Sequence, residues 1–329
     1  MADYDIKKGY TVPIKGDAAQ ETASLPHPPF IGVCPIEFAG LKPKLTVKVN
    51  DEVKVGSPLF FNKKIPELQF LSPAAGRVTA INYGPRRVIE EIIIATNKTY
   101  EYESFPKKDL GGIGKMSRDQ MVAALLKGGV WPYIRQRPYN KIADHEATPK
   151  AIFVNCMDTA PLAADPNYAL KDKGDEFKAG VAALKRLCDT VHVVTTKNGA
   201  ADAFKADNVN SHSFSGKHPA GLVGTHITQI SPINKGEAVW VVNARDAVNI
   251  GHLLLKGQYP TERIVAVAGP GATKAQYYKA QTGIKIKDVL KGNVAAGEQR
   301  IVSGNVLSGS SRSEDGFLGF YDDLITVLP

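Results

Sequence analysis

Three segments between residues 150 and 197 constrain the fold of this chain more than any other stretch. Residues 151–156 (AIFVNC) and 190–197 (TVHVVTTK) are strand-length apolar runs, and residues 174–188 between them have the spacing of an amphipathic helix. Strands buried on both faces form such continuous runs, and a strand–helix–strand order joins parallel strands. The pattern predicts a Rossmann-like α/β domain, which we place at residues 150–258, with a second strand–helix unit near its end (EAVWVVNARDAVNIGHLLL).

The turn after the first of these strands contains no glycine. It reads CMDTAP at residues 156–161, whereas a dinucleotide-binding turn needs the pattern G-x-G-x-x-G so that the backbone can approach a pyrophosphate. Gly269-Pro270-Gly271 with Lys274 also fails the phosphate-loop pattern and is interpreted as a turn at a strand end. We therefore expect this chain to bind neither NADH nor FMN by the usual route.

The stretch before the α/β domain is rich in strands. Leu45, Val47 and Val49 alternate with polar residues, as in a half-buried strand. The patterns V-x-x-x-D-x-V-x-x-G-x-x-L and S-P-A-A-G-R-V resemble the barrel-sandwich fold of biotinyl and lipoyl carrier domains, and we place such a domain at residues 27–106. Residues 1–26 are expected to form an N-terminal arm that ends in the proline-rich SLPHPP.

A carrier function is an alternative that the barrel-sandwich pattern raises. Lys63 and Lys64 lie about where a carrier presents its modified lysine at a hairpin tip. The usual residues around such a lysine are missing, and Pro66 falls where the return strand should begin. We expect the fold without the modification.

Residues 107–149 are predicted to form a basic helix–loop connector. Residues 107–141 carry a net charge of +6 in a chain whose total is +8. Ser117 is a good N-cap for a helix over 118–127, and Gly128-Gly129 ends it. Such a basic segment suits an anionic membrane surface or an acidic partner. Nucleic acid is not expected, because the chain has no helix-turn-helix, zinc-finger or RNP motif.

Aromatic and cationic residues alternate just beyond this helix. A quinone site needs aromatic walls and hydrogen-bond donors for two carbonyl groups. If the segment is extended, Arg135, Arg137 and Tyr139 share one face. The candidates for quinone or partner binding are Trp131, Tyr133, Arg135, Arg137, Tyr139 and Lys141. The alternative is that the first two anchor the loop in the core while the arginines pair with carboxylates.

Composition excludes several classes of site. The three cysteines are widely spaced without a CxxC pair, and the seven histidines lack zinc-site spacing, so neither an iron–sulfur cluster nor a metal site is expected. No apolar run approaches the ~20 residues of a membrane span. No serine or cysteine lies in a nucleophile motif, so the chain offers no catalytic group of its own.

The chain resembles the NqrA family of the Na+-translocating NADH:quinone oxidoreductases, whose members are relatives of the complex I flavoprotein subunit. The similarity covers the N-terminal KKGYTVPIKG (residues 7–16) and the segment after LLKGG, where VWPYIRQRPYNK replaces a glycine-rich flavin loop. The resemblance implies a multidomain α+β chain that ends in a β-grasp domain of the soluble-ligand-binding type, at residues 259–329. It also implies that a further segment follows Pro329.

The same resemblance implies a function. The chain would be a peripheral subunit on the cytoplasmic face of the bacterial inner membrane, in a complex that oxidises NADH, reduces ubiquinone and exports Na+. Its partners would be the other subunits, including membrane subunits, together with ubiquinone. NADH and FMN or FAD would be bound elsewhere in the complex, with no flavin or iron–sulfur cluster on this chain. The alternative is a stand-alone flavoprotein NADH dehydrogenase.

Overall fold

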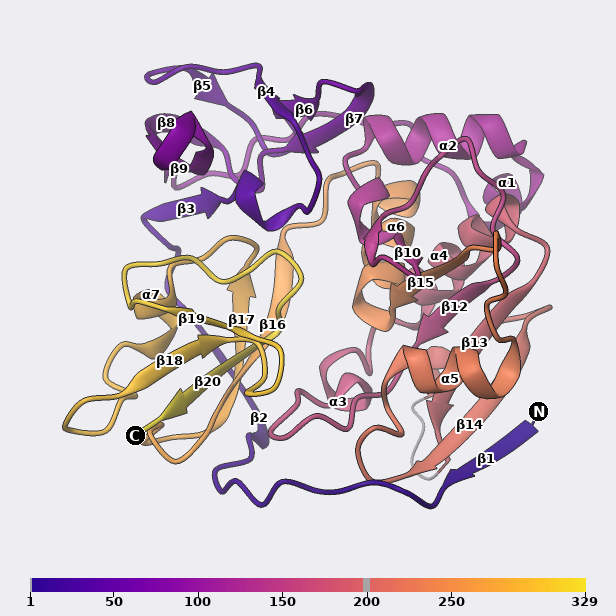
Figure 1. Ribbon diagram of the computed structural model, residues 1–329. Coiled ribbons are helices and arrows are strands. Elements are labelled where there is room, and N and C mark those ends of the chain that lie inside the picture. Colours follow the sequence, from indigo (N-terminus) through magenta and orange to yellow (C-terminus); the bar gives the residue numbers. More distant parts are fainter. Residues whose placement is uncertain (1, 198–201) are drawn as a thin grey trace.

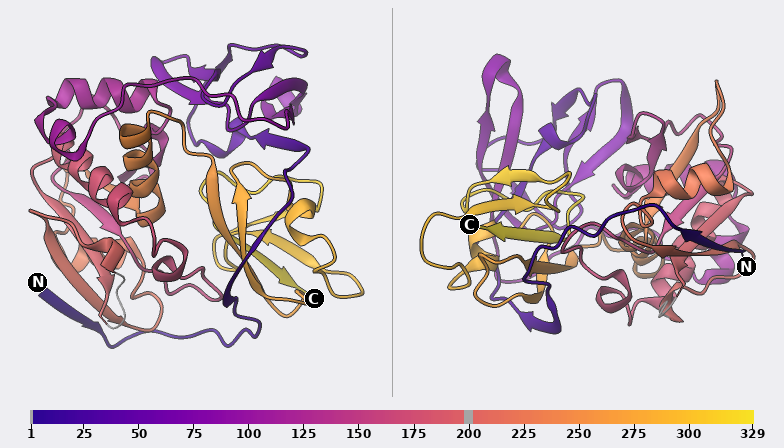
Figure 2. Two further views of the ribbon diagram at one scale, coloured as in Figure 1. Left: turned by 180° about the vertical axis from the view of Figure 1, so that it is seen from behind. Right: turned by 60° about the horizontal axis from the view of Figure 1, so that its bottom comes forward.

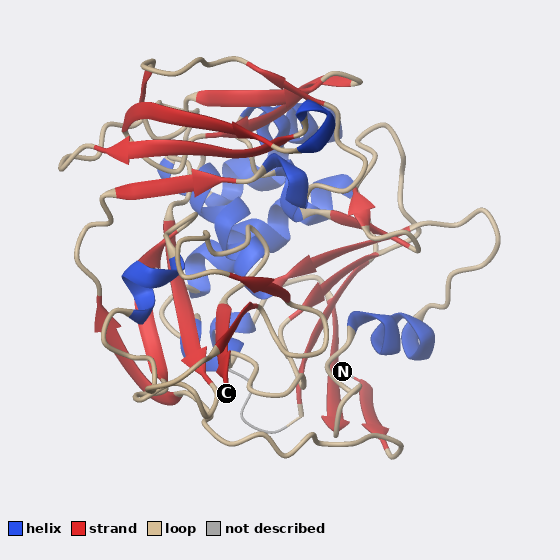
Figure 3. Cartoon of the chain, turned by 60° about the vertical axis from the view of Figure 1, so that its left-hand side comes forward, coloured by secondary structure: helices blue, strands red, loops and turns tan. Residues whose placement is uncertain are grey.

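The computed structural model describes residues 2–197 and 202–329, which form three domains around a common centre (Figure 1). Helices are concentrated in the α/β domain, whereas strands and loops make up most of the other two (Figure 3). This arrangement confirms the multidomain α+β fold class. Four short 3-10 helices complete the description: η1 (Pro35–Glu37), η2 (Pro85–Arg87), η3 (Trp131–Tyr133) and η4 (Asp202–Phe204).

The α/β domain is built on a seven-stranded sheet. Its order is β1 (Ala2–Ile6), β14 (Asn210–Gly216), β13 (Val191–Thr196), β12 (Ile152–Asn155), β15 (Val239–Asn243), β10 (Arg135–Arg137) and β11 (Lys141–Ile142). The first five strands are parallel, and β10 and β11 add an antiparallel edge. The predicted Rossmann-like arrangement is therefore present, and strand order reverses between β12 and β15.

Three helices cover one face of this sheet and one helix covers the other. Successive side chains of a strand point to opposite faces, so Ile152 and Val154 of β12 belong to one apolar cluster and Phe153 to another. The first cluster includes α2 (Arg118–Lys127), α4 (Gly174–Leu187) and α6 (Ala244–Lys256), and the second includes α5 (Val223–Ile230). The short helices α1 (Leu110–Lys115) and α3 (Pro166–Ala169) lie in the connections.

The predicted basic connector is part of the α/β domain. Ser117 caps α2 as expected and forms a full capping box with Gln120, and Gly129 takes the left-handed conformation beyond the helix end. The chain then enters β10, which pairs with β15. β10 and β11 therefore extend the parallel sheet by an antiparallel edge.

The barrel-sandwich domain consists of two sheets. One has the order β3 (Phe30–Val33), β9 (Ile89–Thr96), β8 (Gly76–Tyr83) and β5 (Glu52–Val53), and the other β4 (Pro43–Leu45), β6 (Pro58–Asn62) and β7 (Ile65–Leu71). The expected strand over residues 45–49 is shorter than its alternation indicates, because β4 ends at Leu45 and Val49 is exposed.

The hairpin that joins β6 to β7 presents Lys63 and Lys64 at its exposed tip. Pro66 lies inside β7, so the return strand does form. The pairing between the two strands is nevertheless irregular between Phe61 and Asn62. A proline cannot donate to a strand ladder, and this irregularity accommodates it.

The third domain is a mixed six-stranded sheet with one short helix, α7 (Ile286–Leu290). Its order is β19 (Ser310–Arg312), β18 (Arg300–Ser303), β20 (Leu324–Leu328), β16 (Glu262–Ala268), β17 (Gln276–Gln281) and β2 (Ala19–Ser24). The central strands β16 and β20 run parallel, as the expected β-grasp fold requires.

The N-terminal segment joins two of the three domains. Residues 1–26 are expected from the sequence to form an arm, but β1 pairs with β14 of the α/β sheet and β2 pairs with β17 of the β-grasp sheet. Figure 2 shows this segment crossing the molecule from one domain to the other. Within the described parts of the chain, no helix has the length and apolar character needed to cross a membrane.

Candidate functional site

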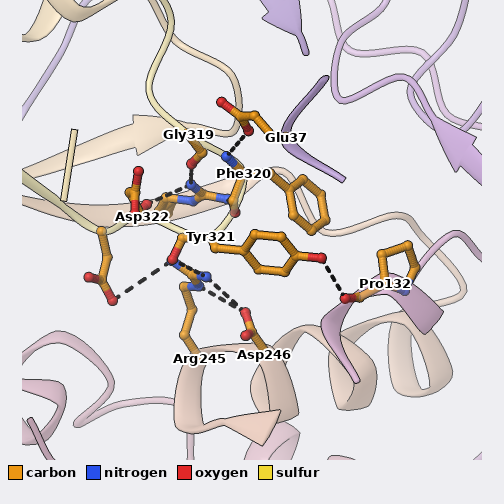
Figure 4. Close-up of polar contacts among 10 residues, drawn as sticks. Glu37, Pro132, Arg245, Asp246, Gly319, Phe320, Tyr321 and Asp322 are labelled. Atoms are coloured by element: carbon orange, nitrogen blue, oxygen red, sulfur yellow. Dashed lines mark hydrogen bonds and ion pairs between the residues drawn. The ribbon is translucent and has the colours of Figure 1, made fainter. Parts of the chain in front are cut away.

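A short loop before β20 contacts all three domains, and we call residues 319–322 the three-domain clasp (Figure 4). Arg263 of β16 stabilises this loop. Its buried guanidinium donates hydrogen bonds to the carbonyl oxygens of Gly319, Phe320 and Asp322 at 2.9, 2.8 and 2.7 Å. Backbone carbonyls that meet one buried cation in this way are held in a fixed arrangement.

The clasp binds the α/β domain through two aromatic rings. Tyr321 donates its hydroxyl proton to the carbonyl oxygen of Pro132 at 2.9 Å, and the Arg135 guanidinium lies 4.3 Å from the centre of the Tyr321 ring. Phe320 stacks on Tyr133 with ring centres 4.9 Å apart. Cation–π and aromatic contacts each contribute about 0.5–2 kcal/mol when desolvated.

The barrel-sandwich domain contacts the clasp through Glu37 and Phe38. The Glu37 carboxylate accepts hydrogen bonds from the Phe320 amide at 2.8 Å and from Arg312 at 2.7 Å. Burial raises the pKa of Glu37, although the Phe320 amide and Arg312 act in the opposite direction. Phe38 packs edge-on against Phe320, with ring centres 5.0 Å apart. The clasp therefore fixes the relative positions of the three domains.

A crevice of about 160 Å³ opens beside the clasp, at the carboxyl ends of β12 and β15. Strand order reverses here, and such switch points are where open α/β sheets bind ligands. We call this cavity the switch-point crevice; its polar lining is Asn155, Asp158, Asn243, Arg245, Asn305, Asp322 and Asp323.

Arg245 is the central charged group of the switch-point crevice. Its guanidinium forms two hydrogen bonds to Asp246 at 3.1 and 2.9 Å, donates to the Tyr321 carbonyl oxygen at 3.2 Å and lies 3.7 Å from Asp323. Burial lowers the pKa of Arg245, but the carboxylates of Asp246 and Asp323 outweigh burial and raise it. Burial also raises the pKa of Asp158. The crevice thus combines one fixed cation, the carboxylates that neutralise it, and one carboxyl group, on Asp158, that resists ionisation.

Two of the six predicted site residues are core residues. Trp131 and Tyr133 are almost fully buried; Trp131 donates to the Ala143 carbonyl oxygen at 2.8 Å and packs edge-on against Trp240. Their rings are occupied by protein contacts, so they cannot form the walls of an open site. The two rings point inward, which alternation in the sequence does not reveal.

The other four predicted residues lie on β10, the turn that follows it and the start of β11. Arg135 and Arg137 are half-buried and share one face of β10, whereas Tyr139 is 83% exposed and Lys141 is exposed. The alternative, in which the arginines pair with carboxylates, is not found among residues 2–197 and 202–329. Arg135 instead donates to the Asn140 carbonyl oxygen and packs on Tyr321. The six residues therefore do not converge on one cavity.

Sequence reasoning missed the residues of the switch-point crevice. In the sequence, Arg245 and Asp246 stand out only as part of a strand–helix turn, and Asp158 only as part of a turn without glycine. The sequence did contain a signal. Arg245 and Asp246 directly follow one buried strand, and the polar turn with Asp158 follows another. Parallel strands bring their carboxyl ends to one edge of the sheet, so these side chains could have been expected to meet there. Asp323, by contrast, reaches the crevice only through the β-grasp domain.

Comparisons with known proteins show which family the chain belongs to. Family models match over residues 4–97 (NqrA N-terminal barrel-sandwich hybrid domain), 116–259 (NqrA second alpha/beta domain) and 264–314 (NQRA C-terminal domain). The NqrA protein of the Na(+)-translocating NADH-quinone reductase of Tolumonas auensis is 40% identical over 326 residues, covering 98% of this chain and 73% of that protein. The chain belongs to the NqrA family.

Other NqrA proteins show the same extent of similarity. Those of Neisseria meningitidis serogroup B and Serratia proteamaculans are each 36% identical, covering 98% of this chain and 72% and 73% of their own lengths. Among solved structures, an NAD+-reducing [NiFe]-hydrogenase in the air-oxidized state has a TM-score of 0.44 at 12% identity, over 70% of this chain and 52% of that one.

Proposed function

We propose that this chain is a peripheral subunit of a Na+-translocating NADH:quinone reductase, a complex that oxidises NADH, reduces ubiquinone and exports Na+. In this proposal the chain docks against other subunits, including membrane subunits at the cytoplasmic face, and takes part in quinone binding. It carries no flavin or iron–sulfur cluster. The names of its relatives and the similarity along nearly the whole chain support the assignment to this complex.

The observation that carries the quinone proposal is the state of Arg137. This guanidinium is half-buried on β10, its Nε has no hydrogen-bond partner, and no ion pair reaches it within the described residues. Burial and the neighbouring Arg135 lower the pKa of Arg137. No described residue accepts a hydrogen bond from the Arg137 side chain, and because its Nε is itself buried, an acceptor from a ligand or another chain would bind the other guanidinium nitrogens. A quinone carbonyl is such an acceptor.

The residues around Arg137 suit a flat, weakly polar ligand at a boundary between subunits. Tyr139 offers an exposed aromatic ring two residues away, and Lys141 offers a second donor. Trp131 and Tyr133, which are buried beneath the loop, would act by positioning it. We therefore retain Arg135, Arg137, Tyr139 and Lys141 as the proposed contact residues.

The turn after β12 supports placing NADH and flavin on other subunits. It offers Asp158 in place of glycines, and a pyrophosphate there would face this carboxyl group and that of Asp323. Titration with NADH or FMN should give no saturable signal. A micromolar dissociation constant for either ligand would contradict this part of the proposal.

Substitution of Arg137 on β10 and of Tyr139 in the turn that follows tests quinone participation. Arg137→Ala should raise the KM for ubiquinone of the assembled complex by about tenfold, the effect of one lost hydrogen bond to a charged donor. Tyr139→Ala should raise it by about two- to tenfold, the effect of one lost aromatic contact. The melting temperature should not fall. Arg86→Ala, which removes an exposed arginine from the β8–β9 hairpin, serves as the control. Unchanged quinone kinetics in both loop variants would show that the loop is only scaffold.

A stand-alone flavoprotein is the second candidate, and colour distinguishes it. A flavoprotein would purify with an absorbance band near 450 nm, whereas the proposed subunit would be colourless. The carrier alternative at Lys63 and Lys64 is tested by intact mass, since an attached lipoyl or biotinyl group adds about 0.2 kDa.

A further inference from the structure

A second and larger cavity, of about 570 Å³, lies between the α/β and β-grasp domains. We call it the interdomain cleft. Helix α6 forms one wall, β16 and β17 form the opposite wall, and residues 24–28 with Tyr100 and Tyr102 form the rim. It meets the switch-point crevice at Arg245, which lines both cavities.

Helix α6 turns a polar stripe toward this cleft. Arg245, Asn249 and His252 line the cavity at a spacing of four and three residues, so they lie on one side of the helix. The opposite side is apolar and packs so closely on α4 that a Cβ added at Gly251 would lie 1.8 Å from the Glu176 carbonyl oxygen. A polar stripe on a helix that is otherwise buried needs partners.

Two members of the stripe have unused hydrogen-bonding groups. Asn249 is 8% exposed, and its amide makes no hydrogen bond to any described residue. The Nη1 atom of Arg245 is buried and also has no hydrogen-bond partner, although it lies 3.7 Å from Asp323. An unpaired buried guanidinium nitrogen costs about 1–3 kcal/mol. The Asn249 amide is not fully buried and lines the cavity, so it is the group suited to a ligand that enters the cleft.

The mouth of the cleft carries one excess positive charge. Lys173 and Lys279 both contact the single carboxylate of Glu262, at 3.5 and 2.6 Å. Burial and the neighbouring lysines Lys173 and Lys256 lower the pKa of His252, so its imidazole adds no charge at neutral pH. Two cations that share one anion favour a ligand with a single negative charge.

The rim of the cleft presents an exposed aromatic ring, that of Tyr100. The Tyr100 side chain is 45% exposed, and His27 packs edge-on against it with ring centres 5.3 Å apart. The Tyr102 ring lies beside Tyr100 with its centre 6.2 Å away. Exposed rings in this arrangement stack readily on a planar ligand.

We propose that the interdomain cleft binds a small organic monoanion that carries a flat ring. The ring lies against Tyr100, the negative group lies between Lys173 and Lys279, and Asn249 supplies a hydrogen bond from the helix wall. This site is distinct from the proposed quinone loop at residues 135–141, which lines neither cavity.

The probe for this site is 8-anilinonaphthalene-1-sulfonate, a ring-bearing monoanion whose fluorescence rises on binding. The full chain should show one saturable site per molecule. Lys279→Glu, which reverses the charge at the mouth, and Asn249→Leu, which removes the amide, should each raise the Kd at least fivefold. Lys178→Glu makes the same charge change on the exposed side of α4 and should leave the Kd unchanged.

Two results would overturn the proposal. One is the absence of saturable binding; the other is an equal Kd in the wild type and both cleft variants. The probe can also be displaced with neutral 1-naphthol or with anionic naphthalene-1-sulfonate. If both compete equally well, the assignment of a negatively charged ligand is wrong. Thermal melting of each variant checks its fold, and Lys279→Glu, at an exposed position, keeps the test decisive if Asn249→Leu is unstable.

Discussion

At the scale of single residues, the buried pair of Arg245 and Asp246 is the most consequential feature. Both side chains are nearly inaccessible to water, and the pair also binds the clasp through the Tyr321 carbonyl. Removal of one partner leaves the other charge buried without compensation. Sequence alone could not show this, because the carbonyl that receives Arg245 lies 76 residues further along the chain.

We expect Arg245→Ala to destabilise the protein by about 3–5 kcal/mol, because Asp246 would lose its partner in a dry environment. Urea unfolding followed by circular dichroism measures this loss. Arg86→Ala removes an exposed arginine and should change stability by less than about 0.5 kcal/mol. Equal unfolding midpoints for the two variants would show that the pair does not hold the domains together.

A pair of histidines in the α/β sheet predicts a decline in stability at acid pH. His192 Nδ1 and His212 Nε2 lie 3.0 Å apart, and burial, with His212 beside it, lowers the pKa of His192 from 6.5 to about 4. The unfolded chain takes up a proton near pH 6.5 while the native chain does not. Stability is therefore full above that pH and falls between about 6.5 and 4, by at most ~1.4 kcal/mol per pH unit for one proton.

His192→Gln should make the dependence of the melting temperature on pH less steep between pH 7 and 5. Part of the decline should persist, because burial lowers the pKa of His226 to about 4 as well. His145→Gln, outside the pair, is the control. A slope identical to that of the wild type in His192→Gln would contradict the assignment.

At the scale of elements, α4 and α6 approach each other through two glycines. A Cβ at Gly180 would lie 1.9 Å from the Ala247 carbonyl oxygen, and one at Gly251 would lie 1.8 Å from the Glu176 carbonyl oxygen. Gly251→Ala should therefore force the helices apart and cost about 1–3 kcal/mol or more.

The matched control for this helix pair is Gly224→Ala in α5, where an added Cβ would meet nothing within 4 Å. That change should stabilise the protein by about 0.5–1 kcal/mol, because alanine favours a helix over glycine. Differential scanning calorimetry of both variants measures the two effects. A stabilising Gly251→Ala would show that the helices are not in such close contact.

Elements with a continuous apolar run or a clear cap could be predicted from sequence. β12, α4 and β13 follow from their apolar patterns, and α2 follows from Ser117 and the paired glycines. β1 and β2 could not be predicted, since they are short, mostly polar and stabilised only by partners more than 200 residues away. The same limit applied to the site: alternation identified the residues around β10 but not which of them point inward.

At the scale of the whole molecule, the clasp joins the three domains. The basic helix–loop segment belongs to the α/β domain. If residues 107–141, with their net charge of +6, dock against acidic groups, binding of the chain to membranes should weaken between 0.1 and 1 M salt. Screening shortens over this range from ~10 to ~3 Å. Sedimentation of the chain with membrane vesicles measures the effect, and binding that is indifferent to salt would indicate an apolar interface.

We propose that the chain works within a Na+-translocating NADH:quinone reductase without holding a flavin itself. Purification of the tagged chain from membranes of a bacterium that expresses the other subunits tests this. We predict that the eluate contains those subunits and shows Na+-stimulated NADH:ubiquinone reductase activity, while the chain purified alone is colourless and inactive. A chain that elutes without partners, or that carries flavin and oxidises NADH alone, would contradict the proposed role.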